Sequence, residues 1–391
     1  MVLEEMELNA ITQETRNALF SVIRCGLGQK APDYQLSSTR CDELLAIGTR
    51  QSILPILYHG LREMNLPLEY QQKFDEARLR DIRKSILRDH ALGVLQATLD
   101  KNRIPYILLK GSVIRNLYPE PTMRTSSDID ILVHEEDTQK AVLAIEAETD
   151  FKAKKNGYHD ISMMNADVHL ELHFNIKENL ENIDKLLREA WNFARETGEG
   201  DKYTFSPEYQ IFHVIAHMSH HFLNGGLGIR PFLDLWLLRT KTEYDEEKVC
   251  QMCAECGILT FYQECSHLTQ VWMENDKHTE ATELLEEICL SGGVFGSQQF
   301  KNAGRQRSQK GLKYLLSRVF PPAYQVKEYY KDSSGKEHSA AYYYMKRLRI
   351  WIGKSRREDL NQQIHEVMNS DRQYLNNADR LFRLLDLQNV K

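Results

Sequence analysis

The chain has 391 residues, of which 42% are hydrophobic and 27% are charged. This length exceeds one ordinary hydrophobic core, so we expect two or three packed units with a typical globular composition. A net charge of −6 and a pI of about 6.2 argue against a protein that mainly coats nucleic acid, because such proteins are usually basic. No apolar stretch reaches the roughly 20 residues of a membrane span. The acidic start is unlike a signal peptide, and the seven cysteines are typical of reduced thiols, so we expect a cytoplasmic protein without a membrane partner.

The first hundred residues are predicted to be helical. Residues 70–99 carry apolar side chains at helical spacing. The polar side of this helix holds a basic stripe, which is typical of a solvated helix face. The stripe consists of Arg78, Arg80, Arg83, Lys84 and Arg88.

A different periodicity begins near residue 104. The apolar run 104–109 predicts a strand that ends in a turn at residues 110–112. Residues 127–133 and 167–176 alternate between polar and apolar side chains, which predicts strands with one buried face. Further elements are expected as a short helix at 113–118, a helix at 138–148 and a strand at 158–164. Together they predict a small mixed sheet with helices on one side.

The remainder of the chain, from residue 207 onward, is predicted to be helical, most strongly at 208–238. We therefore expect an α+β protein. A small mixed β-sheet core at residues 101–200 would be flanked by an N-terminal helical region, 1–100, and a C-terminal helical domain, 201–391.

Three carboxylates occupy polar faces of the alternating strands. Asp128 and Asp130 are two positions apart and point the same way, and Glu171 lies on a later strand. If the two strands are neighbours, the three side chains converge. Carboxylate oxygens suit Mg²⁺ or Mn²⁺, and two such ions can bind the attacking and leaving oxygens of a displacement. An isolated Asp-x-Asp pair is usually surface decoration, so the prediction depends on the ordered set of strands.

The turn upstream of these strands is suited to phosphate. Gly111 allows close approach of the backbone, and Ser112 adds a hydroxyl at a helix N-terminus, where free N–H groups favour anions. Lys110 and Arg124 could supply positive charge to the same triphosphate.

These residues, in this order, resemble the DNA polymerase β-like nucleotidyltransferase superfamily, and within it the bacterial group called uncharacterised nucleotidyltransferases. The resemblance covers about residues 100–176, and it is carried by segments 109–112, 117–119, 127–133 and 170–173 together with Arg124. A weaker resemblance extends to His213, His217, Arg230, Asp234 and the segment 317–330.

The resemblance implies a role for each site residue. Gly111 and Ser112 would hold the triphosphate of an NTP, and Asp128 and Asp130 would bind both metal ions. Glu171 would complete one metal site and help to take the proton from the acceptor hydroxyl.

The expected reaction moves an NMP from an NTP, with ATP favoured, to an acceptor hydroxyl with release of pyrophosphate. The acceptor could be a small molecule, a peptide, a protein or an RNA end. One alternative is a non-catalytic nucleotide-binding or interaction protein on the same fold. Another is an RNA-modifying nucleotidyltransferase that binds RNA through its basic segments, although the net charge does not favour a nucleic-acid partner.

Several other residues have two interpretations each. His213 and His217 share a helical face and could bind zinc or contact the active site, but ordinary hydrogen-bonded histidines are favoured because further ligands are not evident. Arg230 and Asp234 could form a helix pair or line the nucleotide cleft, and the structural pair is favoured. The cysteines at 250, 253 and 256 have metal-like spacing, but buried helical cysteines explain them better. The basic segment 345–357 could touch RNA, although a solvated helix is favoured.

Overall fold

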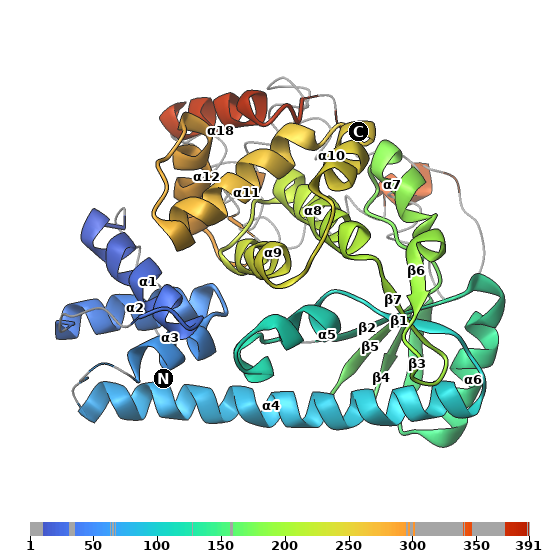
Figure 1. The fold of residues 1–391 in the computed structure, drawn as a ribbon. Coiled ribbons are helices and arrows are strands. Elements are labelled where there is room, and N and C mark those ends of the chain that lie inside the picture. Colours follow the sequence, from blue (N-terminus) through green and yellow to red (C-terminus); the bar gives the residue numbers. More distant parts are fainter. Residues whose placement is uncertain are drawn as a thin grey trace.

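The computed structural model describes residues 11–30, 36–62, 68–126, 128–156, 159–294, 341–345 and 372–388, with a few single residues and pairs between them. Ser127, Tyr158, the segment 317–330 and all but the first residue of the basic segment 345–357 lie outside the described residues. An α+β architecture is present, with one mixed sheet and helices around it (Figure 1).

The N-terminal region is helical, as predicted. Its described residues form four helices, α1 (Gln13–Gly26), α2 (Ser38–Arg50), α3 (Leu54–Leu61) and α4 (Leu68–Lys101). The side chains of Thr12 and Ser37 accept hydrogen bonds from backbone N–H groups in the first turns of α1 and α2, which satisfies donors that have no partner inside the helix. The long helix α4 runs beneath the other three helices and then beneath the sheet (Figure 1).

In the described part of the chain, seven strands form the sheet in the order β3-β4-β5-β2-β1-β7-β6. They are β1 (Tyr106–Leu108), β2 (Asp128–Val133), β3 (Lys152–Asn156), β4 (Asp160–Met164), β5 (His169–His173), β6 (Ala194–Glu196) and β7 (Lys202–Phe205). The predicted strands correspond to β1, β2, β4 and β5. Strands β3, β6 and β7 were not predicted, because they are polar or lack a clear apolar alternation. Of these three, β3 and β6 form the two edges of the sheet, where polar side chains discourage further strand pairing.

Short elements connect the strands. They are α5 (Gly111–Ile114), η1 (Arg115–Leu117), η2 (Pro121–Met123), η3 (Glu135–Asp137), α6 (Thr138–Glu148), α7 (Glu181–Leu187) and η4 (Ala190–Phe193). Helix α6 has the predicted bounds.

Helices cover both faces of the sheet, so the prediction that they lie on one side is wrong. Helices α4 and α6 pack on one face, where Ala91, Ile129 and Leu170 belong to one apolar cluster. On the opposite face, Ile107 and Leu132 belong to the larger core that includes the C-terminal helices. Alternation along a strand predicts two faces but does not reveal that a distant part of the chain covers the second one.

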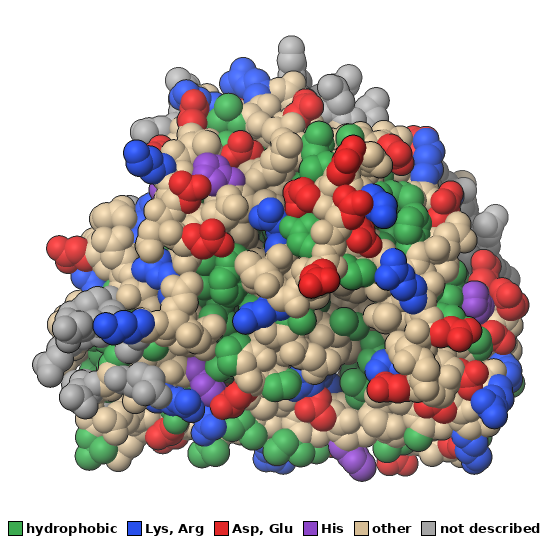
Figure 2. All heavy atoms as spheres, viewed as in Figure 1, with side chains coloured by type: hydrophobic (Ala, Val, Ile, Leu, Met, Phe, Trp, Pro, Cys, Tyr) green, Lys and Arg blue, Asp and Glu red, His purple; other side chains and the backbone are tan. Residues whose placement is uncertain are grey.

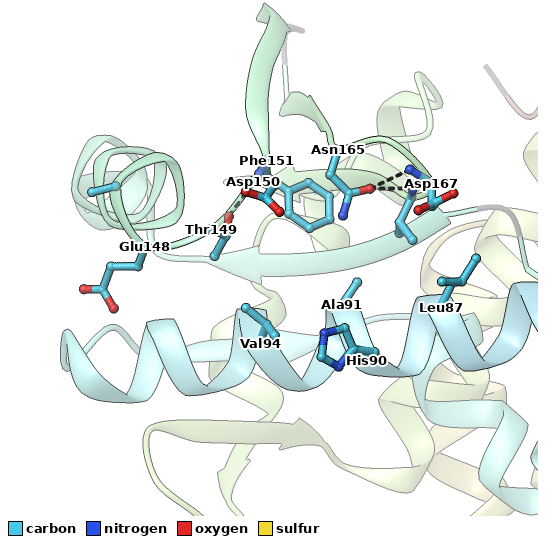
Figure 3. A pocket seen from close by; sticks show the side chains of 12 residues that line it. Leu87, His90, Ala91, Val94, Glu148, Thr149, Asp150, Phe151, Asn165 and Asp167 are labelled. Carbon is cyan, nitrogen blue, oxygen red and sulfur yellow. Dashed lines mark hydrogen bonds between the residues drawn. The ribbon is translucent and has the colours of Figure 1, made fainter.

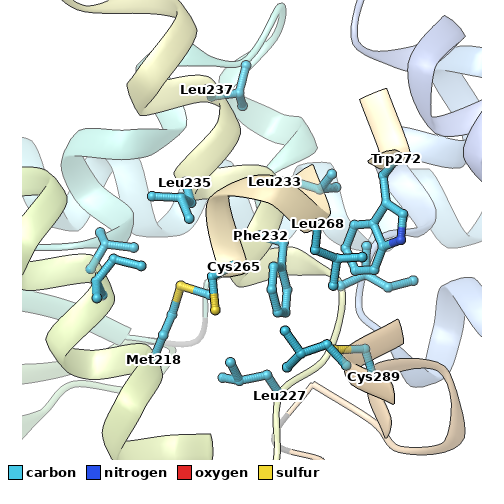
Figure 4. Close-up of a cluster of buried hydrophobic side chains, with 14 of the residues drawn as sticks. Met218, Leu227, Phe232, Leu233, Leu235, Leu237, Cys265, Leu268, Trp272 and Cys289 are labelled. Carbon is cyan, nitrogen blue, oxygen red and sulfur yellow. The ribbon is translucent and has the colours of Figure 1, made fainter. Parts of the chain in front are cut away.

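The C-terminal helices within the described residues include α8 (Pro207–Asn224), α9 (Arg230–Lys241), α10 (Glu246–Glu255), α11 (Leu259–Glu274), α12 (Glu280–Ser291) and α18 (Arg372–Leu384). Phe232 and Trp272 meet edge to face in their core (Figure 4). Phe20 of α1 stacks on the same Trp272 at 4.7 Å between ring centroids. The N-terminal and C-terminal helices therefore share one hydrophobic core. Among the described residues, no helix combines the length and apolarity that a membrane crossing requires.

Candidate active site

The candidate site lies on two neighbouring strands. Strands β2 and β5 pair in parallel, with Asp130 opposite Glu171 and Asp128 opposite His169. The adjacency that the carboxylate prediction required is thus confirmed. These polar side chains lie on the face opposite the apolar cluster under α4 and α6, because successive residues of a strand point to opposite faces.

Three side chains converge on this face. Single ligand atoms of Asp130, Glu171 and His173 all lie within 4.8 Å of one another. Nε2 of His173 is 3.0 Å from Oδ1 of Asp130 and 3.5 Å from Oε2 of Glu171. The alternation of residues 167–176 puts His173 on the same strand face as Glu171, but His173 was not among the predicted site residues. The signal was its position two residues after Glu171 in the alternating run.

Electrostatics keep these groups charged. Burial alone would raise the pKa of Asp130, but the Lys110 ammonium and the hydrogen bond from His173 outweigh it and hold that pKa well below its usual range. The hydrogen bond from His173 also lowers the pKa of Glu171. Burial opposes charge on His173, yet its hydrogen bonds to the two carboxylates raise its pKa. Asp130 and Glu171 are therefore ionised, and anionic oxygens are the ligands that hard divalent cations prefer.

Asp128 lies near this cluster but is not one of its three members. It begins β2, and its Oδ1 accepts a hydrogen bond of 3.0 Å from Oγ of Ser126. The structure therefore brings together Asp130 and Glu171, with Asp128 two positions back on the same strand. The role of Asp128 as a metal ligand stays a prediction.

The predicted phosphate turn is adjacent to the carboxylates. Lys110 precedes α5 with a φ of 41°, a backbone conformation that is uncommon outside glycine. Its Nζ lies 3.8 Å from Oδ1 of Asp130. Oγ of Ser112 is buried and has no hydrogen-bond partner among the described residues. The turn thus presents a cation and an unused hydroxyl beside the site.

Arg124 lies directly over this turn. A Cβ atom at Gly111 would come within 2.4 Å of Nη1 of Arg124, so a larger residue would require the guanidinium to shift. Nε and Nη2 of Arg124 each donate a 2.8 Å hydrogen bond to the carboxylate of Asp234 in α9. The hydroxyl of Tyr118 donates to the same carboxylate. Arg124 is thereby held in one orientation beside Gly111.

Comparison with known proteins gives one decisive match. A family model described as "Uncharacterised nucleotidyltransferase" matches residues 37–274, which is more than half of the chain. The chain belongs to this family. The match includes every residue of the predicted site in this nucleotidyltransferase-family protein.

Two other comparisons add little. No curated protein matches the sequence. One solved structure, described as the antibiotic-resistance factor ANT(2'')-Ia, is 17% identical, with 43% of this chain and 90% of that chain covered. Its TM-score of 0.35 is too low to support a conclusion about this family member.

At Asp234 and His213, two residues of the weaker resemblance, the structure differs from the favoured interpretations. Asp234 pairs with Arg124 rather than in the predicted helix pair with Arg230, whose Nη1 donates to the backbone oxygen of Thr125 at 3.1 Å. His213 is fully buried, and neither ring nitrogen has a hydrogen-bond partner among the described residues. The prediction that His213 makes ordinary hydrogen bonds is therefore wrong, and its burial excludes an accessible metal site at its ring.

The basic stripe of α4 contains one exception to the predicted solvated face. Arg80, Arg83 and Lys84 are exposed, but Arg88 is buried, and its Nη1 and Nη2 have no hydrogen-bond partner among the described residues. Burial lowers the pKa of Arg88 to about 10, with the nearby Arg115 acting in the same direction. Arg88 is covered where α4 passes the segment after α5, since Arg115 bonds to Ser85 and Asp89 of α4.

The cysteines behave as core residues. Cys253 and Cys256 are buried in the family member's main hydrophobic core, as the favoured interpretation predicts. Burial raises the pKa of both thiols. A thiol with a raised pKa is a poor metal ligand, because the thiolate is the binding form.

A separate pocket of about 480 Å³ lies on the α4 and α6 side of the sheet (Figure 3). It is lined by His90 and Ala91 of α4 and by the chain around Phe151 and Asn165. None of the predicted site residues lines it. The chemistry described above is therefore on the other face of the sheet.

Proposed function

We propose that this protein transfers an NMP from an NTP to an acceptor hydroxyl and releases pyrophosphate. The single observation that carries the proposal is the convergence of Asp130, Glu171 and His173 on two paired strands. It lies beside a glycine-serine turn in a chain of the nucleotidyltransferase family. Family membership supports nucleotidyl transfer, and the converging ligand atoms support the use of a divalent cation.

The residues present fit such a cation. Asp130 and Glu171 offer ionised oxygens at the same point. His173 would join them as a ligand only after Nε2 loses the proton that it donates to these carboxylates. We propose that Asp128 contributes a further carboxylate from the start of β2 and that Mg²⁺ or Mn²⁺ is bound, in the two-ion arrangement common for phosphoryl transfer. A bound divalent cation would neutralise negative charge on the phosphates. Lys110, Gly111, Ser112 and Arg124 would hold the triphosphate through charge, close backbone approach and a hydroxyl donor.

The acceptor is proposed to be a hydroxyl-bearing small molecule, peptide or protein, and ATP the favoured NTP. A nucleic-acid acceptor receives less support. On the face shown in Figure 2, basic and acidic side chains are interspersed rather than gathered into one basic surface. Binding to the phosphate backbone of RNA usually depends on clustered positive charge.

The test is incubation of the protein with each α-³²P-labelled NTP, Mg²⁺ or Mn²⁺ and cell extract, followed by identification of the labelled product. We expect Asp130→Asn and Glu171→Gln to lower label transfer by about a hundredfold or more, because charge stabilisation in a displacement is lost. The matched control is Glu136→Gln, because Glu136 is an exposed carboxylate on η3, directly after strand β2. This variant should label normally.

Two outcomes would contradict the proposal. If the unmodified protein binds a non-hydrolysable NTP with metal, as measured by calorimetry, but labels nothing, a non-catalytic nucleotide-binding protein is indicated. If Asp130→Asn labels as well as the unmodified protein, the site assignment is wrong. Labelled RNA would instead support the RNA-modifying alternative.

A further inference from the structure

Glu178 and His217 form a carboxylate-histidine pair that is separate from the residues assigned to the candidate active site. Glu178 follows β5, and its Oε1 is 2.7 Å from Nδ1 of His217 in helix α8. The side chain of Glu178 is only 7% exposed, whereas that of His217 is 31% exposed. The backbone of Glu178 is fixed at both polar groups, since its N–H donates to Asp184 and its carbonyl accepts from Nδ1 of His220 at 2.5 Å. The pair is thus rigid on the carboxylate side and open on the histidine side.

The pair is coupled electrostatically to Asp130 of the site, and Glu178 follows His173 by five residues along the chain. Lys110 has its Nζ 3.8 Å from Asp130, and the charges of Asp130 and Glu178 together raise the pKa of this lysine against the effect of burial. The charges of Lys110 and Asp130 also act on His217. Lys110 is therefore coupled electrostatically to both groups.

The hydrogen bond determines which nitrogen of His217 carries the proton. His217 lowers the pKa of Glu178 to about 2, against the effect of burial, so this carboxylate is ionised and can only accept. Nδ1 of His217 must then be the donor, and in the neutral ring Nε2 holds a lone pair. Burial and the nearby Lys110 lower the pKa of His217 and so favour this neutral ring.

The lone pair of His217 faces His221. Its Nε2 is 3.0 Å from Nε2 of His221, so the N–H of His221 donates to it in the described structure. The charged and titratable groups around His217 are Glu178 from the β5–α7 connection, Lys110 and Asp130 from the sheet side, and His213, His220 and His221 from its own helix. This is the arrangement in which a carboxylate orients an imidazole for proton transfer.

We propose that His217, oriented by Glu178, is the general base that takes the proton from the acceptor hydroxyl; the proposal rests on the function proposed above. The hydroxyl would replace the N–H of His221 at Nε2. As the acceptor oxygen bonds to the α-phosphorus, the bond from that phosphorus to the pyrophosphate oxygen breaks and the hydroxyl proton moves to Nε2. The imidazolium that forms is stabilised by the Glu178 carboxylate. Glu171 is assigned to the cation in the function proposed above, so its oxygens are engaged there.

The kinetic test uses α-³²P-labelled ATP and the extract that supplies the acceptor. We expect His217→Gln and Glu178→Gln to lower the labelling rate at pH 7 by about 10²–10⁴-fold, the usual contribution of general-base catalysis. Binding of a non-hydrolysable NTP, measured by calorimetry, should change by less than about threefold, because the pair acts on the acceptor. His267→Gln is the matched control, since His267 also pairs with a carboxylate, Asp276, at 3.5 Å, but in a different part of the structure.

The pH profile separates a base from a structural residue. The rate of the unmodified protein should fall with decreasing pH below the ordinary range of histidine, as Nε2 becomes protonated, and His217→Gln should lose this dependence. Unchanged labelling by His217→Gln would overturn the proposal and leave Glu171 as the candidate base. Absence of labelling by the unmodified protein would instead contradict the proposed function.

A spectroscopic test needs no acceptor. In protein labelled with ¹⁵N-histidine, long-range ¹H–¹⁵N spectra at pH 7 should show His217 neutral and protonated at Nδ1. Glu178→Gln should reduce the population of that tautomer, whereas His267→Gln should not. A His217 ring that is protonated at Nε2, or at both nitrogens, would contradict the assignment even in a correctly folded protein.

Discussion

Gly111 illustrates how a single residue can position the site. The turn between β1 and α5 brings its Cα against the guanidinium of Arg124, and that guanidinium is already held by Asp234. A methyl group at Gly111 therefore cannot be accommodated without moving Arg124. The same position precedes Ser112, whose hydroxyl has no partner among the described residues.

We expect Gly111→Ala to weaken binding of a non-hydrolysable NTP by about tenfold or more, which corresponds to about 1.4 kcal/mol. The reason is displacement of Arg124 from the turn. Calorimetric titration in the presence of Mg²⁺ measures the effect. Gly93→Ala is the control, because Gly93 is exposed inside α4 with nothing within 4 Å of a Cβ. That change should leave binding intact and stabilise the protein by about 0.5–1 kcal/mol. Equal NTP affinity in both variants would show that Arg124 is not part of the phosphate site.

Two elements far apart in the sequence are joined by one buried ion pair. Arg124 follows η2 in the sheet core, and Asp234 belongs to α9 of the C-terminal helices. Their side chains are only 9% and 6% exposed. Asp234 raises the pKa of Arg124 against the effect of burial, so the pair is charged. It therefore fixes α9 against the turn that carries Gly111.

We expect Arg124→Met to lower the free energy of unfolding by about 3–5 kcal/mol, because it leaves the Asp234 carboxylate buried without its cation. The double variant Arg124→Met, Asp234→Leu should be less destabilised than the sum of the two single variants, with a coupling of about 2–3 kcal/mol. Denaturant titration followed by circular dichroism measures all three. Additive effects would mean that the two side chains do not stabilise each other in solution.

At the scale of the whole molecule, the N-terminal helices and the C-terminal helices act as one packed body around the sheet. Besides the contact between Phe20 and Trp272, the side chain of Gln51 after α2 donates to the backbone oxygens of Cys289 and Gly292 at 2.8 Å. The boundaries 1–100, 101–200 and 201–391 stay a prediction. Helix α8 lies inside this body and carries the buried His213. Protonation of the His213 ring therefore affects the stability of the whole fold.

Acid should destabilise the protein through His213. Burial lowers its pKa to about 3, against about 6.5 in the unfolded chain, so below pH 6.5 the unfolded state binds more protons. Stability is therefore greatest above pH 6.5 and declines as the pH falls toward 3. At pH 5 the loss from this residue is about 2 kcal/mol.

Replacement of His213 by leucine should remove this loss. When the pH is lowered from 8 to 5, the unmodified protein should lose about 2 kcal/mol more free energy of unfolding than His213→Leu loses. Denaturant titrations at both pH values measure it, and the exposed His90→Leu is the control. If the difference is the same at both pH values, His213 does not stay neutral in the folded protein.

Much of the site was predictable because alternation along a strand is a local property. It placed Asp128 and Asp130 on one face, set Glu171 on the polar face of a later strand, and located the turn at Gly111 and Ser112. The helix bounds of α6 and most of α4 followed from local periodicity in the same way. The strands β3, β6 and β7 were missed because short polar or irregular strands carry little alternation.

The sequence by itself determined which side chains share a face, since that depends only on neighbours along the chain. Only the tertiary structure decided which faces meet. It paired β2 with β5, brought His173 between two carboxylates, and joined Arg124 to Asp234. It also buried Arg88 and placed Glu178 against His217 from a distant helix. The physical reason is that periodicity reports the orientation of a side chain, whereas its partner is set by packing between segments that are remote in sequence.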